Sequence, residues 1–167
     1  MVIMLSDKEN STDRRIAELL NHKGASIIMD NKISDQSGKF IVINHHKTFK
    51  ITAEKGIVIA TDAINNFKKQ NFPKGIIGIC NQDNFNALKL FKNNNIPVIT
   101  CGRGAKNTFT VSSIAEESVL LSLQRSIPDI NGRYIEPCEI RVNIFKNEDL
   151  FSILAATVTM LIYSVTP

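Results

Sequence analysis

The sequence predicts an α/β fold, with a mostly parallel, Rossmann-like sheet flanked by helices and an antiparallel extension near the C-terminus. Two patterns support this prediction. Residues 75–102 contain two short apolar runs, 76–80 and 96–101, on either side of a helix-like segment, which is the strand–helix–strand unit of a parallel sheet. From residue 109 onward, apolar and polar residues alternate, as they do in half-exposed antiparallel strands.

Length and composition indicate one globular domain. The chain has 167 residues, of which 43% are apolar, enough for a single domain over 1–167 with a proper core. We expect residues 1–10 to be flexible. The net charge of +4 is scattered in pairs at most, so a nucleic-acid partner is not expected. The three scattered cysteines and the lack of a signal peptide predict a cytoplasmic protein with reduced thiols.

The first half of the chain predicts alternating helices and strands. Ser11 or Thr12 can cap a helix that stops at Gly24. Thr61 or Asp62 can cap a second, short helix that ends before residues 72–75. The apolar runs predict strands at 25–29, 40–43 and 56–60, with 49–53 as a further pairing segment and the polar residues 30–39 as a turn.

The second half begins with a helix whose N-cap is Asp83 or Asn84. Phe85, Leu88 and Phe91 recur at helical spacing and predict its buried face. Half-exposed strands are predicted at 109–111, 119–123 and 140–144, with turns at 115–118 and 129–132.

Residues 150–167 are uncharged and mostly apolar, and their length approaches that of a membrane span. They include five serine and threonine residues, however, and no basic cluster flanks them. A buried core helix is the better interpretation, so a membrane partner is not expected.

The candidate ligand site lies where two predicted strands end. Asn81 and Asp83 follow one strand, and Gly102, Arg103, Gly104 and Lys106 follow the next. Open α/β sheets bind ligands at the carboxyl ends of their strands. Glycine amides with two cations could therefore hold a small anionic ligand. The simpler alternative is a turn that needs glycine for a positive φ angle.

The sequence supports a catalytic or metal site less well than it supports this ligand site. Asp62 and Asp83 both follow strands and could bind Mg²⁺ or exchange protons, although both also suit a helix N-cap. His45 and His46 are adjacent and would point to opposite faces of a strand. We therefore expect no catalytic residues, no metal and no cofactor.

Several segments resemble the second half of the ATP-binding central domain of the Mur ligases. Asn81-Gln82-Asp83 is similar to that family's Asn-x-Asp-Asp at a strand end, and residues 98–102, Val-Ile-Thr-Cys-Gly, are similar to a following strand. Residues 151–156 resemble the family's Tyr-Asn-x-Leu-Ala-Ala helix start, and the resemblance spans about 56–165.

The departures from that family bear on function. The family's P-loop, ending in Gly-Lys-Thr/Ser, is missing, because Phe40 follows Gly38-Lys39 and His46 precedes Lys47-Thr48. Its His-Asn pair would fall on residues 148–149, which are Glu and Asp. The resemblance therefore implies a non-catalytic ligand-binding or assembly module, linked to cell-wall metabolism, with a small anion or a protein as partner. The alternative is an enzyme of unknown reaction that uses Asp62, Asn81 and Asp83. The sequence does not indicate an oligomeric state.

Overall fold

A computed structural model describes residues 1–8, 10–29, 32–35, 38–45, 51–61, 64, 71–144 and 148–167. Its main feature is a 10-stranded sheet in the order β12-β9-β8-β7-β6-β5-β1-β4-β2-β3, with β10 and β11 forming a separate two-stranded ribbon. The parallel part runs from β2 to β8, and β3, at one end of the sheet, is antiparallel to β2. At the other end β9 is antiparallel to both β8 and β12.

The elements alternate in the first half of the chain and become mainly strands in the second. The strands are β1 (Val2–Leu5), β2 (Ser26–Met29), β3 (Lys32–Ser34), β4 (Ile41–His45), β5 (Gly56–Ala60), β6 (Ile76–Asn81), β7 (Val98–Gly102), β8 (Phe109–Ile114), β9 (Ser118–Leu123), β10 (Ile127–Pro128), β11 (Tyr134–Ile135) and β12 (Cys138–Asn143). The helices in the described part of the chain are α1 (Ser11–His22), α2 (Phe85–Asn93) and α3 (Leu150–Ile162).

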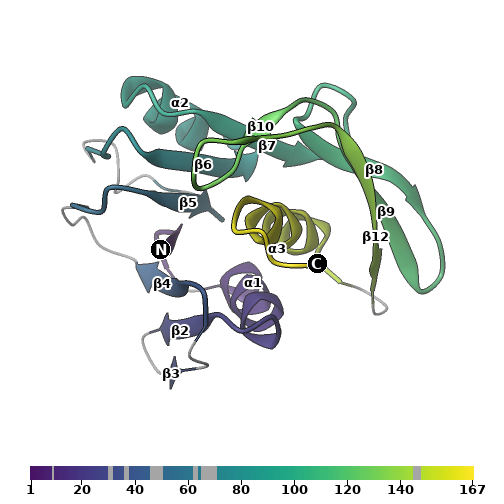
Figure 1. The fold of residues 1–167 in the computed structure, drawn as a ribbon, viewed down its shortest axis with the longest axis horizontal. Coiled ribbons are helices and arrows are strands. Elements are labelled where there is room, and N and C mark those ends of the chain that lie inside the picture. The colour runs from purple at the N-terminus through teal and green to yellow at the C-terminus, as the bar shows by residue number, and fades with distance from the viewer. Residues whose placement is uncertain are drawn as a thin grey trace.

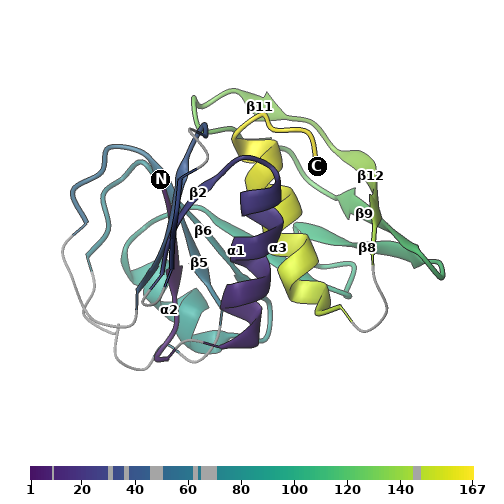
Figure 2. The same cartoon turned by 90° about the horizontal axis from the view of Figure 1, so that it is seen from below.

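The sheet curves around α1 and α3, while α2 covers the opposite face (Figure 1). Figure 2 shows α1 and α3 side by side. In β1, Val2 and Met4 belong to the core beneath α1 and α3, whereas Ile3 and Leu5 belong to the core beneath α2. Successive side chains of a strand point to opposite faces, so β1 has to be apolar throughout because both of its faces are covered.

The predicted α/β fold class is confirmed, but the expectation of a flexible N-terminus is wrong for residues 2–5. Val2–Leu5 form a fully buried strand between β4 and β5. The apolar residues Val2 to Leu5 were the signal for this strand. Their place at the start of the chain suggested fraying, yet parallel pairing on both sides holds them.

Other differences concern boundaries and faces. β3 lies in the segment predicted as a turn, and α1 is capped by Asn10 rather than Ser11 or Thr12. In α2, Asn84 is the N-cap as one alternative predicted, but Phe85 is 77% exposed. The buried face of α2 is instead formed by Ala87, Leu90 and Phe91. Residues 51–53 are not in a strand, and the helix predicted after Asp62 lies mostly outside the described residues.

The C-terminal segment forms the core helix that the sequence predicted. Ten residues of α3 are buried, among them Leu154 with no exposed surface. In the part of the chain that the structure describes, no helix combines the length and apolar character needed to cross a bilayer.

Candidate functional site

The strand order changes direction at β1, which pairs with β4 on one side and β5 on the other. In an open α/β sheet, the crevice outside the carboxyl ends of the strands at such a point is the usual ligand site. The loop that leaves β1 here runs directly into α1, the arrangement in which phosphate-binding loops place their glycine amides. Residues 6–10 are Ser-Asp-Lys-Glu-Asn and contain no glycine.

A buried carboxylate occupies this position. Asp13, in the first turn of α1, has no exposed surface. Its Oδ2 accepts hydrogen bonds from Ser6 Oγ at 2.8 Å and from Asn44 Nδ2 at 3.3 Å, and its Oδ1 accepts one from Thr61 Oγ1. Ser6 follows β1, Asn44 lies near the end of β4, and Thr61 follows β5. One buried side chain therefore contacts the carboxyl ends of three neighbouring strands.

Asp13 also closes the start of α1 through a capping box. The Asn10 side chain accepts the Asp13 N–H at 2.9 Å, and the Asp13 carboxylate accepts the Asn10 N–H at 3.3 Å. A capping box satisfies N-terminal amides that have no partner within the helix. The carboxylate also lies at the positive end of the helix dipole.

The start of α3 lies beside the start of α1. Thr12 Oγ1 donates to Asp149 Oδ2 at 3.2 Å, and Ser152 Oγ donates to the same carboxylate oxygen at 2.6 Å. Asp149 is the N-cap of α3 and accepts the Phe151 and Ser152 N–H groups. The adjacent Glu148 is paired with Arg15.

Two helix N-termini therefore meet at the carboxyl edge of the sheet, and each has an acidic side chain in its cap: Asp13 in the capping box of α1 and Asp149 as the N-cap of α3. A phosphate entering this crevice would meet the carboxylates of Asp13 and Asp149 at short range. Sequence analysis did not single out these residues. One signal for Asp13 was available in the sequence. It follows Asn10 by three residues, which is the spacing of a capping box, just before the apolar face of a helix.

The predicted ligand residues lie at the ends of β6 and β7, farther along the same edge. These strands pair in parallel with Asn81 opposite Cys101, and the Gln82 N–H donates to the Cys101 carbonyl at 3.2 Å. The structure therefore brings the Asn81–Asp83 loop and the loop after Gly102 together. Asn81 Oδ1 accepts the Asp83 N–H at 3.0 Å, which shapes the first loop.

The side chain of Asn107 lies inside the second loop, the one after Gly102, and is fully buried. Asn107 Nδ2 donates to the Gly104 carbonyl at 2.9 Å, while its Oδ1 has no hydrogen-bond partner among the described residues. A Cβ atom on Gly102 would lie 2.9 Å from Asn107 Nδ2. Neither Gly102 nor Gly104 has a positive φ angle, so close approach, and not a left-handed turn, explains glycine at position 102.

Three cationic residues lie on or beside this loop. Arg103 and Lys106 are exposed on the loop itself, and Arg125, which follows β9, donates from its guanidinium to the Lys106 carbonyl at 3.4 Å. Among the described residues, none forms an ion pair with Arg103 or Lys106. Arg125 was not predicted because it is 19 residues from Lys106 in the sequence.

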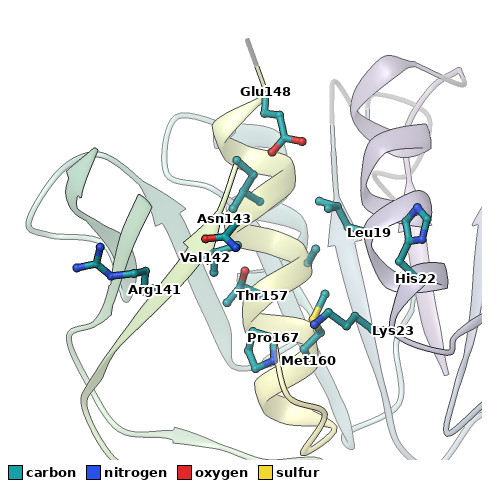
Figure 3. Close-up of a pocket in the computed structure, with 12 residues that line it drawn as sticks. Leu19, His22, Lys23, Arg141, Val142, Asn143, Glu148, Thr157, Met160 and Pro167 are labelled. Atoms are coloured by element: carbon teal, nitrogen blue, oxygen red, sulfur yellow. The ribbon is translucent and has the colours of Figure 1, made fainter. Parts of the chain in front are cut away.

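A second concave region lies between α1, α3 and β12 (Figure 3). It is a groove of about 360 Å³, with Ile153, Ala156 and Met160 of α3 among its lining residues. Asp62 lies outside the described residues, so its relation to either site is not given by the structure. Among the described residues, no group of three His, Cys, Asp or Glu side chains is arranged to hold a metal.

Comparison with solved structures identifies the fold. A murein peptide ligase, Mpl, from Psychrobacter arcticus matches 99% of this chain and 44% of its own, with a TM-score of 0.57 and 9% identity. MurF from Acinetobacter baumannii matches 99% of this chain and 42% of its own, with a TM-score of 0.53 and 10% identity. A UDP-N-acetylmuramoyl-L-alanyl-D-glutamate–2,6-diaminopimelate ligase gives a TM-score of 0.53 at 8% identity, over 98% of this chain and 42% of its own.

These likenesses concern the fold alone. The chain spans less than half the length of the ligases that it matches. No family model matches the sequence, and no curated protein matches it. The chain therefore has a Mur-ligase-like α/β fold, and the structural match extends over residues 1–55 as well as the segments that resembled the family in sequence.

Proposed function

We propose that this chain is a non-catalytic binding module with a Mur-ligase-like fold, acting in the cytoplasm in connection with cell-wall metabolism. Its ligand is a small phosphorylated molecule, bound where β6 and β7 end. The observation that carries this proposal is the place of two carboxylates, Asp13 in the capping box of α1 and Asp149 as the N-cap of α3. It removes the usual phosphate position from the centre of the sheet edge and leaves the cationic loop after β7 as the site for an anion.

The loop after β1 has no phosphate clamp, which argues against nucleotide hydrolysis. Phosphoryl transfer depends on groups that position the phosphates and neutralise charge in the transition state. In a P-loop these groups are glycine amides and a lysine, whereas the loop after β1 has no glycine and Asp13 lies at its end. The negative charge of Asp13 and Asp149 opposes the same charge that a catalyst would have to stabilise.

The loop after β7 is cationic, in contrast to the acidic starts of α1 and α3. Arg103, Lys106 and Arg125 bring positive charge to one exposed loop, and the parallel pairing of β6 with β7 sets Asn81 and Asp83 beside it. Asn81 and Asp83 can accept hydrogen bonds from ligand hydroxyl groups, and the cations can donate to phosphate oxygens. This combination suits a nucleoside monophosphate or a sugar phosphate.

Calorimetric titration with inorganic phosphate, UMP and AMP tests the site. We expect weak binding by the wild type and at least about a tenfold loss in the Arg103→Ala/Lys106→Ala variant, because charge-assisted hydrogen bonds contribute about 1.5–3 kcal/mol each. A Lys8→Ala/Arg14→Ala variant loses the same charge near α1 and should bind as the wild type does. The proposal is wrong if no ligand gives heat at millimolar concentration, or if the two double variants bind equally.

A further inference from the structure

β12 forms one edge of the main sheet, and within the described residues it pairs only with β9. The Ile144 N–H donates to the Glu117 carbonyl at 3.0 Å, so this position is hydrogen-bonded toward β9. Hydrogen-bonded positions alternate along an antiparallel ladder. The backbone groups of Glu139, Arg141 and Asn143 therefore point away from β9, toward the open edge.

The side chains of β12 also alternate. Ile140 and Val142 pack against the main core, whereas Glu139 and Arg141 are exposed. Figure 3 shows Arg141 directed away from α3. On that exposed face Ser112 Oγ donates to Glu139 Oε1 at 2.8 Å, which fixes the position of one carboxylate oxygen.

This edge is complementary to itself in one register. If two copies pair antiparallel about a two-fold axis at Ile140, Glu139 of each copy lies opposite Arg141 of the other, and Cys138 lies opposite Val142. Opposite charges at directly paired positions stabilise a sheet, and like charges destabilise it. Centring the pair on Arg141 instead would set two arginines against each other.

We propose that two copies of this chain associate through β12 in the register centred on Ile140, joining their sheets into one. Each Glu139–Arg141 pair then exchanges two backbone hydrogen bonds in addition to its ion pair. Pro137 precedes the strand and has no N–H to donate, so the ladder ends there. The interface involves neither Arg103 nor Lys106, and its existence does not depend on the anion site.

The groove of Figure 3 lies beside this edge. It is lined by Arg141, Val142 and Asn143 of β12 and, among others, by Leu19 of α1 and the C-cap residue Lys23. An exposed strand edge flanked by open space is a template for another strand. The identical edge of a second copy is the partner whose charges match it.

Charge exchange at the paired positions tests the register. By sedimentation equilibrium, we expect the wild type to show a concentration-dependent dimer of two 18.6 kDa chains. Glu139→Arg and Arg141→Glu should each give monomers, because each variant sets like charges opposite each other. An equimolar mixture of the two variants should restore the dimer, since every mixed pair again joins opposite charges. A monomeric wild type, dimers of either variant alone, or a mixture that stays monomeric would overturn the proposal.

A disulfide provides a second test that does not depend on charge. In this register Cys138 and Val142 of the second copy form a non-hydrogen-bonded pair with Cα atoms about 4.5 Å apart, which suits a disulfide. The two Cys138 residues would be about 13 Å apart, four residues along a strand. Mild oxidation should therefore link the Val142→Cys variant into a covalent dimer and leave the wild type unlinked. Much less of the Val142→Cys/Glu139→Arg variant should be linked, because its like charges oppose the pairing. Efficient linkage of the wild type, or equal linkage of both variants, would contradict this register.

Discussion

Thr12, in the first turn of α1, donates a hydrogen bond to Asp149, the N-cap of α3, with 3.2 Å between Oγ1 and Oδ2. The two residues are 137 positions apart in the sequence. Their contact sets the starts of α1 and α3 together at the carboxyl edge of the sheet. It therefore places the Asp149 carboxylate beside the crevice that Asp13 already occupies.

Removing the Asp13 side chain should destabilise the fold strongly. Asp13→Ala removes the buried carboxylate that accepts hydrogen bonds from Ser6, Asn44 and Thr61, and the loss of a buried hydrogen-bond partner costs about 1–3 kcal/mol. We expect a loss of about 3 kcal/mol in the free energy of unfolding, measured in urea. Asp149→Ala removes an exposed helix cap and should cost only about 1 kcal/mol. Equal losses in the two variants would show that Asp13 has no special structural role.

The loop after β7 should tolerate a methyl group at one glycine and not at the other. In Gly102→Ala the new Cβ would lie 2.9 Å from the Asn107 amide, which is fully buried and donates to the Gly104 carbonyl, and overpacking costs about 1–3 kcal/mol. In Gly104→Ala the nearest atoms, at 3.4 Å, belong to the side chain of Gln82, so the change should stay within about 0.5 kcal/mol. Thermal unfolding of both variants checks this, and a larger loss for Gly104→Ala would contradict it.

The buried thiols predict a loss of stability at alkaline pH. Burial raises the pKa of Cys80 from 9.0 to about 12, and burial together with the nearby Cys80 raises the pKa of Cys101 as well. The folded state thus holds these protons more tightly, so their contribution is complete below pH 9.0 and is lost as the pH rises from there toward 12. We expect unfolding to become progressively easier as the pH rises through this range.

Cysteine variants separate this effect from other alkaline changes. Burial also raises the pKa of Tyr163, to about 12, so some alkaline dependence should remain in any variant. Cys80→Ala/Cys101→Ala should weaken the dependence between pH 9 and 11. Cys138→Ala removes an exposed thiol and should leave it unchanged. Identical pH profiles for the two variants would count against the assignment.

α3 should contribute to stability as a core helix does. Leu154 has no exposed surface, and replacing a buried leucine with alanine typically costs about 2–5 kcal/mol. Leu161 lies in the same helix and is only half-buried, so Leu161→Ala should cost clearly less. Denaturant unfolding of the two variants provides the comparison, and a smaller loss for Leu154→Ala would contradict the packing.

The sequence predicted the elements whose pattern is local. The runs at 56–60, 76–80 and 96–101 became β5, β6 and β7 to within two residues at each end, and their parallel pairing followed from the helix between the last two. The buried α3 followed from its uncharged composition. The Asn81 and Gly102 loops were expected to meet, and they do.

What the sequence did not predict depends on contacts between distant residues. β1 pairs with strands about 40 and 55 residues away, and nothing in Val2 to Leu5 indicates partners so far along the chain. Asp13 resembled any acidic residue in a first helical turn until Ser6, Asn44 and Thr61 were seen to converge on it. Phe85 was expected in the core because it is apolar and correctly spaced, but α2 turns another face inward.

The most direct measurement is a titration of isotope-labelled protein with Mg-ATP, followed by backbone amide NMR. If Asp13 and Asp149 close the central crevice and the cationic loop binds phosphate, shifts should concentrate in residues 81–83 and 102–107. The amides of residues 10–13 and 149–152 should stay in place, and no ADP should accumulate during the titration. Saturable shifts at residues 10–13, accompanied by steady ATP hydrolysis, would contradict both the closed crevice and the non-catalytic role.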